Sequence, residues 1–484
     1  MKILAVFDDT IAKSEVIQDV IGSKGFGDVV VKRKHLSDYY KEAVESCFED
    51  VKWLHVHSVY ELNDILNNLP AYELAELQGI IHCFANYFVA DSTAAKLSLK
   101  KLLFINEPFL MQSEGKNIAC LFPNIEMYKR FLENTTLKTT SELVESIKEH
   151  FEADGFIDIG IVANFIQCIT GNFDARYFNS LSGNEYTLVK SSTNKKKIKS
   201  EYTYYHLLPE DMKMWFIMPF AYQETAEHAS YTMERLHMTD LAIKWVHGSI
   251  DYNEFNNLLD KYFYFFKQRH SKAISKAEYH AIAKSLYVDK VKSRIQELKK
   301  LPEFAKIQNL LQASNVISID ELVEKYFYLK DKIEAQAKYD YVSVIGHGDP
   351  CFANTLYNKS TKTLKFIDPK GALSEEELWT NPYYDIAKLS HSVCGRYDYF
   401  NNGLFEIKIK EDFSSELCID FDNKEYISIF RQKVEANGFD YWRVRIYEAS
   451  LFISMLPLHI DYPYKVYGFI LNAANILKEI EENV

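Results

Sequence analysis

The stretch from residue 344 to residue 371, VIGHGDPCFANTLYNKSTKTLKFIDPKG, constrains this chain more than any other. Two short apolar segments, 355–357 and 364–367, have the composition of β-strands. The segment 358–362 between them, NKSTK, has residues that favour a turn. The pattern therefore predicts a β-hairpin.

Three side chains that carry oxygen ligands stand at the ends of this hairpin. Asn354 precedes the first strand, Asp368 follows the second, and Asp349 lies just upstream. We expect all three at the same open end of the hairpin. Carboxylate and amide oxygens of this kind suit Mg²⁺, which is often bound by one or two carboxylates together with substrate phosphates. A plain hairpin with an acidic flank is the alternative.

The same residues match the requirements of phosphoryl transfer. That reaction uses one Asp to orient the attacking hydroxyl, and an Asn and a second Asp to hold metal ions. The spacing His347-x-Asp349-x-x-x-x-Asn354 fits the catalytic loop of protein kinases, with Gly348 in place of the usual Arg. The pattern predicts Asp349 as the catalytic residue, Asn354 and Asp368 as metal ligands, and His347 as a structural support of the loop.

Length and composition limit the protein class. A chain of 484 residues is long enough for two or three domains, and 47% hydrophobic with 26% charged residues is typical of a globular protein. The net charge of −12 argues against nonspecific binding of nucleic acid, although the basic run 195–197 could bind an anion.

The cysteines and the apolar runs indicate the compartment. Seven Cys residues are scattered without a C-x-x-C pair, which favours reduced thiols over a disulfide framework or a zinc site. The first residues, MKILAVFDDT, lack the apolar core of a signal peptide, and no apolar run reaches the roughly 18 residues of a membrane span. We expect a cytoplasmic protein.

Residues 1–150 alternate between strand and helix patterns, which predicts a small α/β domain with a parallel sheet. The predicted strands are 2–7, 29–31, 53–57, 79–88 and 117–122, and the predicted helices are 36–48, 60–69 and 92–103, the last capped by Asp91 or Ser92. An amphipathic helix over 140–151 would link this domain to the next.

The first domain does not declare a function in its sequence. Phe7-Asp8-Asp9-Thr10 follows the first strand, but a phosphatase motif needs one residue between its two Asp. The glycine cluster 22–27, GSKGFG, lacks the spacing of a phosphate-binding Walker loop.

Residues 151–238 read as strands followed by a helix, which is the plan of a kinase amino-terminal lobe. The predicted strands are 157–169, 177–181 and 186–190, with a turn at 182–184, and the helix contains Glu201. Lys190 ends the third strand and is the expected phosphate-binding Lys, with Glu201 as its ion-pair partner. Segment 171–176 would cover the phosphates.

Two more strands are predicted at 216–220 and 230–236. In the kinase plan the second leads into a hinge whose backbone binds adenine. The hinge candidates are Met233, Glu234, Arg235 and Leu236.

Residues 239–484 are predicted to form a helical lobe around the catalytic stretch. Aromatic and aliphatic residues recur at helical spacing in 252–266 and predict a core-facing stripe. The other predicted helices are 240–246, 291–298, 319–335, 382–389, 441–456 and 464–480.

Motifs over about residues 170–400 resemble the aminoglycoside phosphotransferase and choline kinase family. They are ARYFNSL, VKSS, KKKIKSE, YTMERL, HGDPCFAN, IDPKG and YYDIAKLSHS. As a set they are similar to the phosphotransferase domains that are fused to sugar nucleotidyltransferases in bacterial capsule and lipopolysaccharide pathways. The resemblance implies an α+β two-lobed kinase-like fold, with a small antiparallel-sheet lobe and a helical lobe, preceded by the small α/β domain.

The same resemblance implies a function. ATP and Mg²⁺ would be the cofactors, and the acceptor would be a hydroxyl of a small molecule such as a sugar, polyol or amino alcohol. In this family an Asp matching Asp385 steadies the catalytic loop, whereas the helix dipole alone would also favour an Asp there.

The first domain departs from the fused relatives, because Phe7-Asp8-Asp9-Thr10 stands where a nucleotidyltransferase carries a glycine-rich loop. Two alternatives therefore stay open: a non-catalytic nucleotide-binding module, and a bifunctional enzyme whose first domain catalyses a separate nucleotidyl or sugar transfer. The sequence leaves the acceptor and the oligomeric state open.

Overall fold

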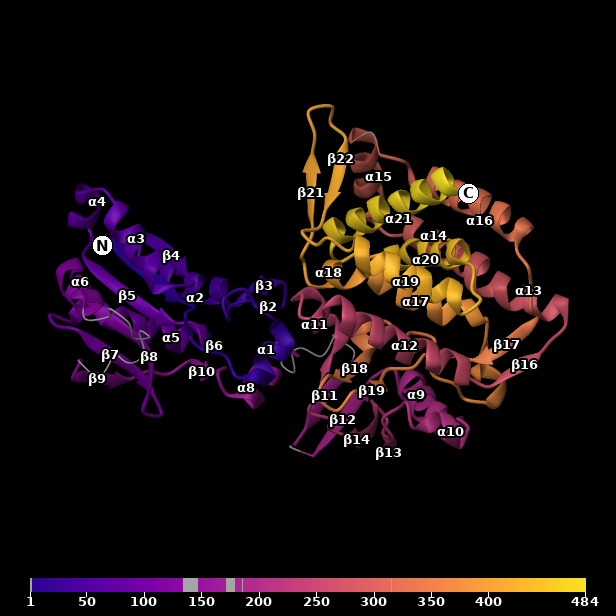
Figure 1. Cartoon of the computed structure of the whole chain (residues 1–484), viewed down its shortest axis with the longest axis horizontal. Helices are drawn as coiled ribbons and strands as arrows, with labels where there is room; N and C mark the ends of the chain where they lie inside the picture. Colours follow the sequence, from indigo (N-terminus) through magenta and orange to yellow (C-terminus); the bar gives the residue numbers. More distant parts are fainter. Residues whose placement is uncertain (1, 134–146, 171–178, 185, 315) are drawn as a thin grey trace. The chain divides into compact units, whose positions relative to one another are not determined.

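The computed structural model describes residues 2–133, 147–170, 179–184, 186–314 and 316–484. The chain divides into two compact units, Met1–Phe173 and Asp174–Val484 (Figure 1). The observed division lies more than twenty residues beyond the boundary expected at 150. Strands and a helix from the region after 150 belong to the first unit.

A six-stranded sheet forms the centre of the first unit. Its order is β4 (Asp50–Val56), β1 (Lys2–Asp8), β5 (Gly79–Phe84), β8 (Lys116–Phe122), β7 (Phe109–Ser113) and β9 (Glu149–Glu152). Strands β4, β1 and β5 are parallel, but β8 runs antiparallel to both neighbours. The expected parallel sheet is therefore wrong for this half. Glu114 and Gly115, both with positive φ, connect β7 to β8, and so short a connection joins only antiparallel strands.

The helices of the first unit are α1 (Glu15–Ile21), α2 (Leu36–Glu45), α3 (Val59–Asn68), α4 (Ala71–Ala75), α5 (Ser92–Leu99), α6 (Ile125–Glu133) and α8 (Val162–Ile169). Of these helices, α2, α3 and α6 pack on this sheet, whereas α1 packs on α8 and α5 packs on α2. Asp91 caps α5, since its carboxylate accepts hydrogen bonds from the backbone N–H groups of Thr93 and Ala94. Two small ribbons complete the unit: β2 (Val30–Val31) with β3 (Lys34–His35), and β6 (Tyr87–Val89) with β10 (Phe156–Asp158).

Two predictions near the end of the first unit are wrong. The strand predicted over 157–169 is mostly helix α8, in which Phe165, Cys168 and Ile169 are buried at the i, i+3, i+4 spacing of one helical face. The helix predicted over 140–151 instead ends in strand β9, which pairs with the edge of β7. The rest of that prediction lies on residues 134–146, outside the described residues.

The second unit begins with a four-stranded antiparallel sheet and one long helix. The strand order is β11 (Asn179–Gly183), β12 (Thr187–Ser192), β14 (Ala229–Glu234) and β13 (Pro219–Glu224), and the helix is α9 (Lys195–Leu207). The Asn184 side chain closes the first turn by accepting from the N–H groups of Tyr186 and Thr187. Strand β13 begins three residues later than predicted. The segment 171–176, expected to cover phosphates, lies outside the described residues.

Helices dominate the remainder of the second unit (Figure 1). They are α10 (Glu210–Lys213), α11 (Leu241–Val246), α12 (Tyr252–Gln268), α13 (Lys276–Lys284), α14 (Lys290–Lys299), α15 (Phe304–Ala313), α16 (Ile319–Gln336), α17 (Pro382–Val393), α18 (Tyr397–Asn401), α19 (Lys424–Ala436), α20 (Tyr441–Met455) and α21 (Pro463–Asn483). The stripe predicted on 252–266 is confirmed as core, because Phe255, Leu258, Tyr262 and Phe265 are all buried.

Short strands support the catalytic stretch. They are β15 (Thr239–Asp240), β16 (Ser271–Ala273), β17 (Val342–Ile345), β18 (Thr355–Asn358), β19 (Thr363–Phe366) and β20 (Trp379–Thr380), and β21 (Glu406–Ile409) pairs with β22 (Ser415–Cys418) elsewhere. Strands β18 and β19 are antiparallel, with Thr355 opposite Phe366. The predicted hairpin is therefore confirmed.

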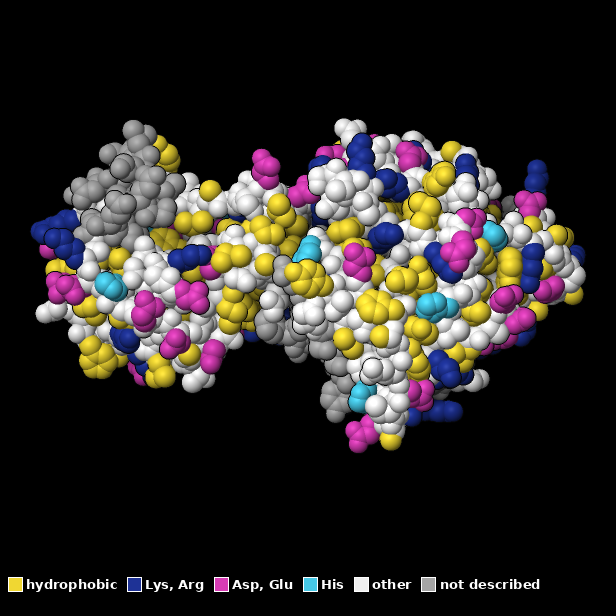
Figure 2. Space-filling view, turned by 90° about the horizontal axis from the view of Figure 1, so that it is seen from below, with side chains coloured by type: hydrophobic (Ala, Val, Ile, Leu, Met, Phe, Trp, Pro, Cys, Tyr) yellow, Lys and Arg dark blue, Asp and Glu magenta, His cyan; other side chains and the backbone are white. Residues whose placement is uncertain are grey.

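Three further observations concern the surface, the thiols and the length of the helices. Basic and acidic side chains are interspersed on the face of the molecule in Figure 2, where the described residues form no broad basic surface. All seven cysteines are free thiols. None of the helices that the structure describes combines the length and the apolar character needed to cross a bilayer.

Candidate functional site

A cavity of about 570 Å³ lies in the second unit between the small sheet and the helices. Five residues predicted from the sequence line it: Lys190, Glu201, Asp349, Asn354 and Asp368. Lys190 comes from β12 and Glu201 from α9. Asn354 and Asp368 flank the β18–β19 hairpin, and Asp349 lies on the loop before it. Distant parts of the chain thus contribute polar groups to one enclosed space.

Lys190 forms the centre of one end of the cavity. Its side chain is buried on β12, and its Nζ lies 2.7 Å from Glu201 Oε2 and 2.7 Å from Asp368 Oδ1. Tyr231 donates a hydrogen bond of 3.1 Å to the same Glu201 oxygen. Burial lowers the pKa of Lys190, but the two carboxylates outweigh burial and raise the pKa above its ordinary value. Lys190 is therefore a fixed cation.

The two ends of the hairpin meet beside this cation. The Ile367 N–H donates to the Asn354 carbonyl at 3.0 Å, and the Asn354 side-chain amide donates to the Asp349 carbonyl at 3.0 Å. Asp368 follows with a left-handed backbone, φ 54°. The amide oxygen of Asn354 and the carboxylate of Asp368 are hard oxygen ligands on one cavity, so the donor set fits Mg²⁺.

His347 is engaged at both ring nitrogens. The Asp349 N–H donates to Nδ1 at 3.0 Å, so Nε2 carries the ring proton and donates to the Ile367 carbonyl at 3.0 Å. The ring is completely buried and stacks on Phe216, and burial lowers the pKa of His347. A neutral ring with both nitrogens bonded can hold the loop against the hairpin but cannot act as a base.

Asp385 binds the backbone of the catalytic loop. Its carboxylate accepts from the N–H of His347 at 2.9 Å and from the N–H of Gly348 at 2.8 Å. Arg269, the residue that follows α12, lies 2.9 Å from the same carboxylate, and both side chains are buried. The sequence allowed two interpretations of Asp385, as a support of the catalytic loop or as an acidic residue favoured by the helix dipole. The structure contains the contact with the loop that the first interpretation requires. Sequence reasoning missed Arg269, because nothing in the local pattern of α12 distinguishes a buried Arg from a solvated one.

Lys388 is a second residue that sequence reasoning missed. Its Nζ lies 3.1 Å from Asp349 Oδ1. Burial raises the pKa of Asp349, but the Lys388 ammonium outweighs burial and brings the pKa below its ordinary value. Asp349 is therefore ionised at neutral pH. The signal was available in the sequence, since Lys388 lies one helical turn after Asp385 on α17.

The cavity continues past Lys388 along the same face of α17. Tyr384, Lys388 and His391 follow the i, i+4, i+7 spacing and all line the cavity. Lys290 from α14 faces them, and its Nζ donates to the Tyr384 hydroxyl at 2.8 Å. The sequence analysis included Tyr384, Lys388 and His391 only as part of the YYDIAKLSHS motif, without a role, and did not include Lys290.

The hinge candidates lie apart from this cavity. Met233 contributes to a separate small pocket, which shares Glu201 and Asp368 with the large cavity. Among the residues that the structure describes, the lining of the large cavity does not include 233–236. The Arg235 N–H donates to the Tyr186 carbonyl at 2.9 Å, and its guanidinium donates to the Asn184 carbonyl. The Arg235 N–H is thus already used and is not free to bind adenine.

Comparison with known proteins finds no similar sequence and only distant structural similarity. No family model matches the sequence, and no curated protein matches it. The chain is similar to solved aminoglycoside phosphotransferases. A thermostable mutant of aminoglycoside phosphotransferase APH(4)-Ia in its apo form is 11% identical over 63% of this chain and 94% of its own, with a TM-score of 0.35.

A second structure shows the same degree of likeness. The streptomycin–ATP–APH(2")-IIa ternary complex is 14% identical over 67% of this chain and 96% of its own, again with a TM-score of 0.35. Scores of this size do not establish a shared fold, so the function of this chain has to be argued from its own residues.

Proposed function

We propose that the second unit is an ATP- and Mg²⁺-dependent phosphotransferase that phosphorylates a hydroxyl group of a small molecule. The observation that carries the proposal is the double ion pair of Lys190 with Glu201 and Asp368, in a cavity that also contains Asp349 and Asn354. A strand Lys paired with a helix Glu, and an Asp and Asn near a second Asp, are the parts that kinases use.

Each residue has a role in this reaction. Lys190 would bind the nucleotide phosphates. Asn354 and Asp368 would hold Mg²⁺, which would supply positive charge to offset that of the phosphates. Asp349 orients the acceptor hydroxyl. The oxygen of the acceptor hydroxyl forms a bond to the γ-phosphorus. The bond between the γ-phosphorus and the β–γ bridging oxygen breaks, and ADP leaves with the electron pair.

The proton of the acceptor hydroxyl passes to Asp349. Because Lys388 keeps the pKa of Asp349 low, this carboxylate is a weak base, and orientation is its main contribution. His347 and Asp385 position the loop that carries Asp349. They act through that loop rather than on the substrate.

The resemblance of the motifs extends the proposal to a biological setting. We place the enzyme in the cytoplasm, where ATP and reduced thiols occur, with a precursor of a bacterial surface polysaccharide as the acceptor. The adenine would lie near β14, with Met233, Glu234 and Leu236 as the remaining hinge candidates.

Measuring ADP release from Mg·ATP over a broad panel of hydroxyl acceptors tests the activity. Asp349→Asn should reduce turnover by roughly 10²–10⁴-fold, while the dissociation constant of Mg·ATP stays within about threefold. Unchanged turnover in this variant would remove Asp349 from the mechanism. Binding of Mg·ATP without turnover of any acceptor would favour the alternative of a non-catalytic nucleotide-binding module.

The first unit is tested separately. Incubating the full chain with nucleoside triphosphates and sugar phosphates, and measuring pyrophosphate release, addresses the bifunctional alternative. Pyrophosphate release that persists in Asp349→Asn would assign a nucleotidyl transfer to the first unit.

A further inference from the structure

The lining of the large cavity contains more cationic than anionic side chains. Five of the lining residues are lysines (Lys190, Lys197, Lys290, Lys370 and Lys388) and three are carboxylates (Glu201, Asp349 and Asp368). Lys190 holds two of those carboxylates and Lys388 holds the third. All three carboxylates are therefore already ion-paired, two with Lys190 at the proposed nucleotide end and one with Lys388 at the catalytic loop.

Lys290 has no carboxylate partner within the part of the chain that the structure describes. Its Nζ donates to the phenol of Tyr384 at 2.8 Å. Burial raises the pKa of Tyr384, but Lys290 and Lys388 outweigh burial and bring the pKa below its ordinary value. The Asp349 carboxylate balances the charge of Lys388, so Lys290 is the group that contributes a net positive charge to this part of the cavity.

His391 gives an independent sign of an unfilled polar site. Its side chain is only 1% exposed, yet its Nε2 has no hydrogen-bond partner among the described residues. The ring is held between Tyr397 and Phe452 and lines the cavity. Leaving such a buried nitrogen unpaired is unfavourable, and a ligand with a suitable polar group would remove that cost.

We propose that Lys290, Lys388 and His391 bind an anionic group of the acceptor. This inference rests on the proposed phosphotransferase function and narrows it: the acceptor is a hydroxyl compound that carries a phosphate or carboxylate, rather than an amino alcohol. Lys388 contacts Asp349, so the anionic group binds close to the hydroxyl that is phosphorylated. The ring of Tyr397 and the Met455 side chain offer apolar contact to the carbon skeleton.

Two matched series of acceptors test the charge preference. One consists of glycerol 3-phosphate, glycerate, glycerol and 3-amino-1,2-propanediol, and the other of glucose 6-phosphate, glucuronate, glucose and glucosamine. We expect kcat/KM to be at least about tenfold higher for the anionic members than for the neutral ones, and lowest for the amines. The phosphate and carboxylate members separate the two anion sources. Preference for neutral or cationic members would overturn the inference.

Substitution of Lys290 tests whether the preference for anionic acceptors depends on this side chain. Lys290→Met should lower kcat/KM for the best anionic acceptor by roughly ten- to hundredfold, whereas a neutral acceptor should be affected less than about threefold. Lys290→Glu should reverse the order toward the amine. Lys292→Met is the matched control, since Lys292 lies exposed on the same helix, and it should change neither. Equal losses for anionic and neutral acceptors would contradict the assignment.

Equilibrium binding separates this inference from the proposed function. Glycerol 3-phosphate and inorganic phosphate are titrated by calorimetry into the full chain with Mg·AMP-PNP bound. Anion binding that Lys290→Met weakens at least about tenfold supports the site even if no acceptor is turned over. If neither anion binds, or Lys290→Met binds them equally well, the site is wrong even if another acceptor is phosphorylated.

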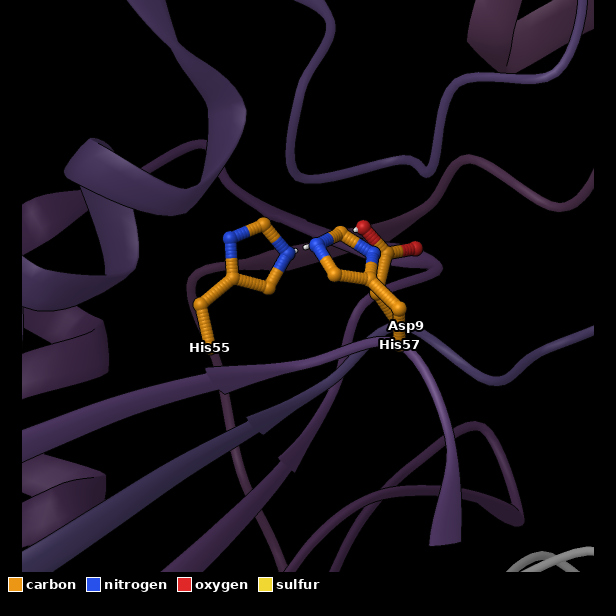
Figure 3. A group of neighbouring side chains, drawn as sticks. All are labelled: Asp9, His55 and His57. Carbon is orange, nitrogen blue, oxygen red and sulfur yellow. Dashed lines mark hydrogen bonds and ion pairs between the residues drawn. The ribbon is translucent and has the colours of Figure 1, made fainter. Parts of the chain in front are cut away.

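A different observation, in the first unit, carries a second inference. Asp9, His55 and His57 lie at the carboxyl ends of the parallel strands β1 and β4, and their ligand atoms are all within 4.8 Å of one another (Figure 3). His55 Nε2 is 3.0 Å from Asp9 Oδ2, and the two imidazole rings are 4.4 Å apart. Ligands of open α/β sheets bind at this edge.

The backbone of the glycine cluster 22–27 holds Asp9 in place. Asp9 accepts hydrogen bonds from the N–H groups of Phe26 at 2.7 Å and Gly27 at 2.8 Å. A Cβ at Gly25 would lie 2.1 Å from Asp9 Oδ2, so only Gly lets the loop approach this closely. These contacts explain Asp9 as a loop anchor, but they do not explain why two imidazoles converge on it.

We infer that Asp9, His55 and His57 bind one divalent transition-metal ion such as Zn²⁺. One carboxylate and two neutral imidazoles are a usual ligand set for this ion, and three protein ligands leave a fourth position for water or a substrate oxygen. Asp9 is buried, His55 is partly buried and His57 is exposed, so the fourth position is accessible to solvent.

Metal titration of the untagged full chain, after treatment with a chelator, tests this site. We expect one equivalent of Co²⁺ to bind with the visible absorption of a nitrogen–oxygen ligand set, and Zn²⁺ to displace it. His57→Ala, at an exposed position, should weaken binding at least about tenfold, whereas the exposed control His150→Ala should not. Absence of stoichiometric binding, or equal binding by both variants, would overturn the inference.

Discussion

Lys190 and Gly348 illustrate what single residues do in this site. Lys190 Nζ holds two carboxylates, that of Glu201 on the next helix and that of Asp368, which lies 178 residues away in sequence. Gly348 stands where protein kinases carry an Arg. Its φ is +85°, and a Cβ there would lie 2.4 Å from Lys370 Cβ, so a side chain at this position would force the loop away from Lys370.

Replacing Lys190 tests the nucleotide end of the cavity. Lys190→Met should weaken Mg·ATP binding by roughly ten- to hundredfold, because a charge-assisted contact to phosphate is lost. Since the variant also leaves Glu201 buried without its partner, binding is compared with that of Lys190→Met/Glu201→Gln, which removes both charges. Lys199→Met, exposed on α9, is the control. Calorimetric dissociation constants that do not change would exclude Lys190 from nucleotide binding.

At the scale of elements, α12 and α17 fix the catalytic loop through one buried ion pair. Asp385 on α17 binds two loop N–H groups, and Arg269 at the end of α12 neutralises its charge. The hairpin β18–β19 fixes the other side of the loop through His347. Three elements therefore hold Asp349 in position, and the side chains through which they do so, Arg269, Asp385 and His347, do not have to touch a substrate.

Removing one partner of this ion pair should be costly. We expect Arg269→Leu to lower the free energy of unfolding by roughly 3–5 kcal/mol, because Asp385 is then a buried charge without a counterion. The double variant Arg269→Leu/Asp385→Asn should recover part of that loss. Urea denaturation of the three proteins measures both effects. A loss of less than about 1 kcal/mol in the single variant would show that the pair is not needed for stability.

Helix and strand predictions differed in accuracy for a physical reason. Helices such as α12, α14 and α21 were predicted close to their observed bounds, because their periodic apolar faces are local signals. Strand predictions failed where pairing decided the outcome. Residues 149–152 form a strand because they pair with the edge of β7. The apolar run Val162–Ile169 is compatible with a strand or a helix, and its packing in the folded unit decides for a helix.

At the scale of the whole molecule, buried acids couple stability to pH. Burial raises the pKa of Asp398 to about 7 and that of Glu448 to about 7, and both side chains are completely buried in the second unit. The folded-state pKa values lie above those of an unfolded chain, so the folded state holds these protons more tightly. Their contribution to stability is complete below about pH 4 and is lost as the pH rises through about 7.

Asp398→Asn tests this coupling. In the wild type, the free energy of unfolding should fall by roughly 1–3 kcal/mol per group between about pH 5 and about pH 8.5. In the variant, the part of this decrease in the free energy of unfolding that comes from Asp398 should disappear, and the part that comes from Glu448 should remain. Urea unfolding at several pH values, followed by fluorescence, measures both slopes. Identical pH dependence in the two proteins would show that Asp398 stays ionised when folded.

The sequence by itself determined the local parts of this protein. The hairpin, the spacing of His347, Asp349 and Asn354, and the helix that begins near Asp385 follow from turn chemistry, strand composition and helical period within short windows. The Lys190–Glu201 pair was also predictable, because a strand and the next helix place them only eleven residues apart in sequence.

Only the tertiary structure decided which distant residues meet these local parts. Arg269 beside Asp385, Lys290 beside Tyr384, Asp9 beside His55, and the mixed order of the first sheet depend on packing between segments that no short pattern relates. A charged side chain is equally compatible with solvent and with a buried partner until the fold brings a partner to it. For that reason phosphoryl transfer could be proposed from the sequence, whereas the proposal of an anionic acceptor depends on how α14 and α17 pack against each other.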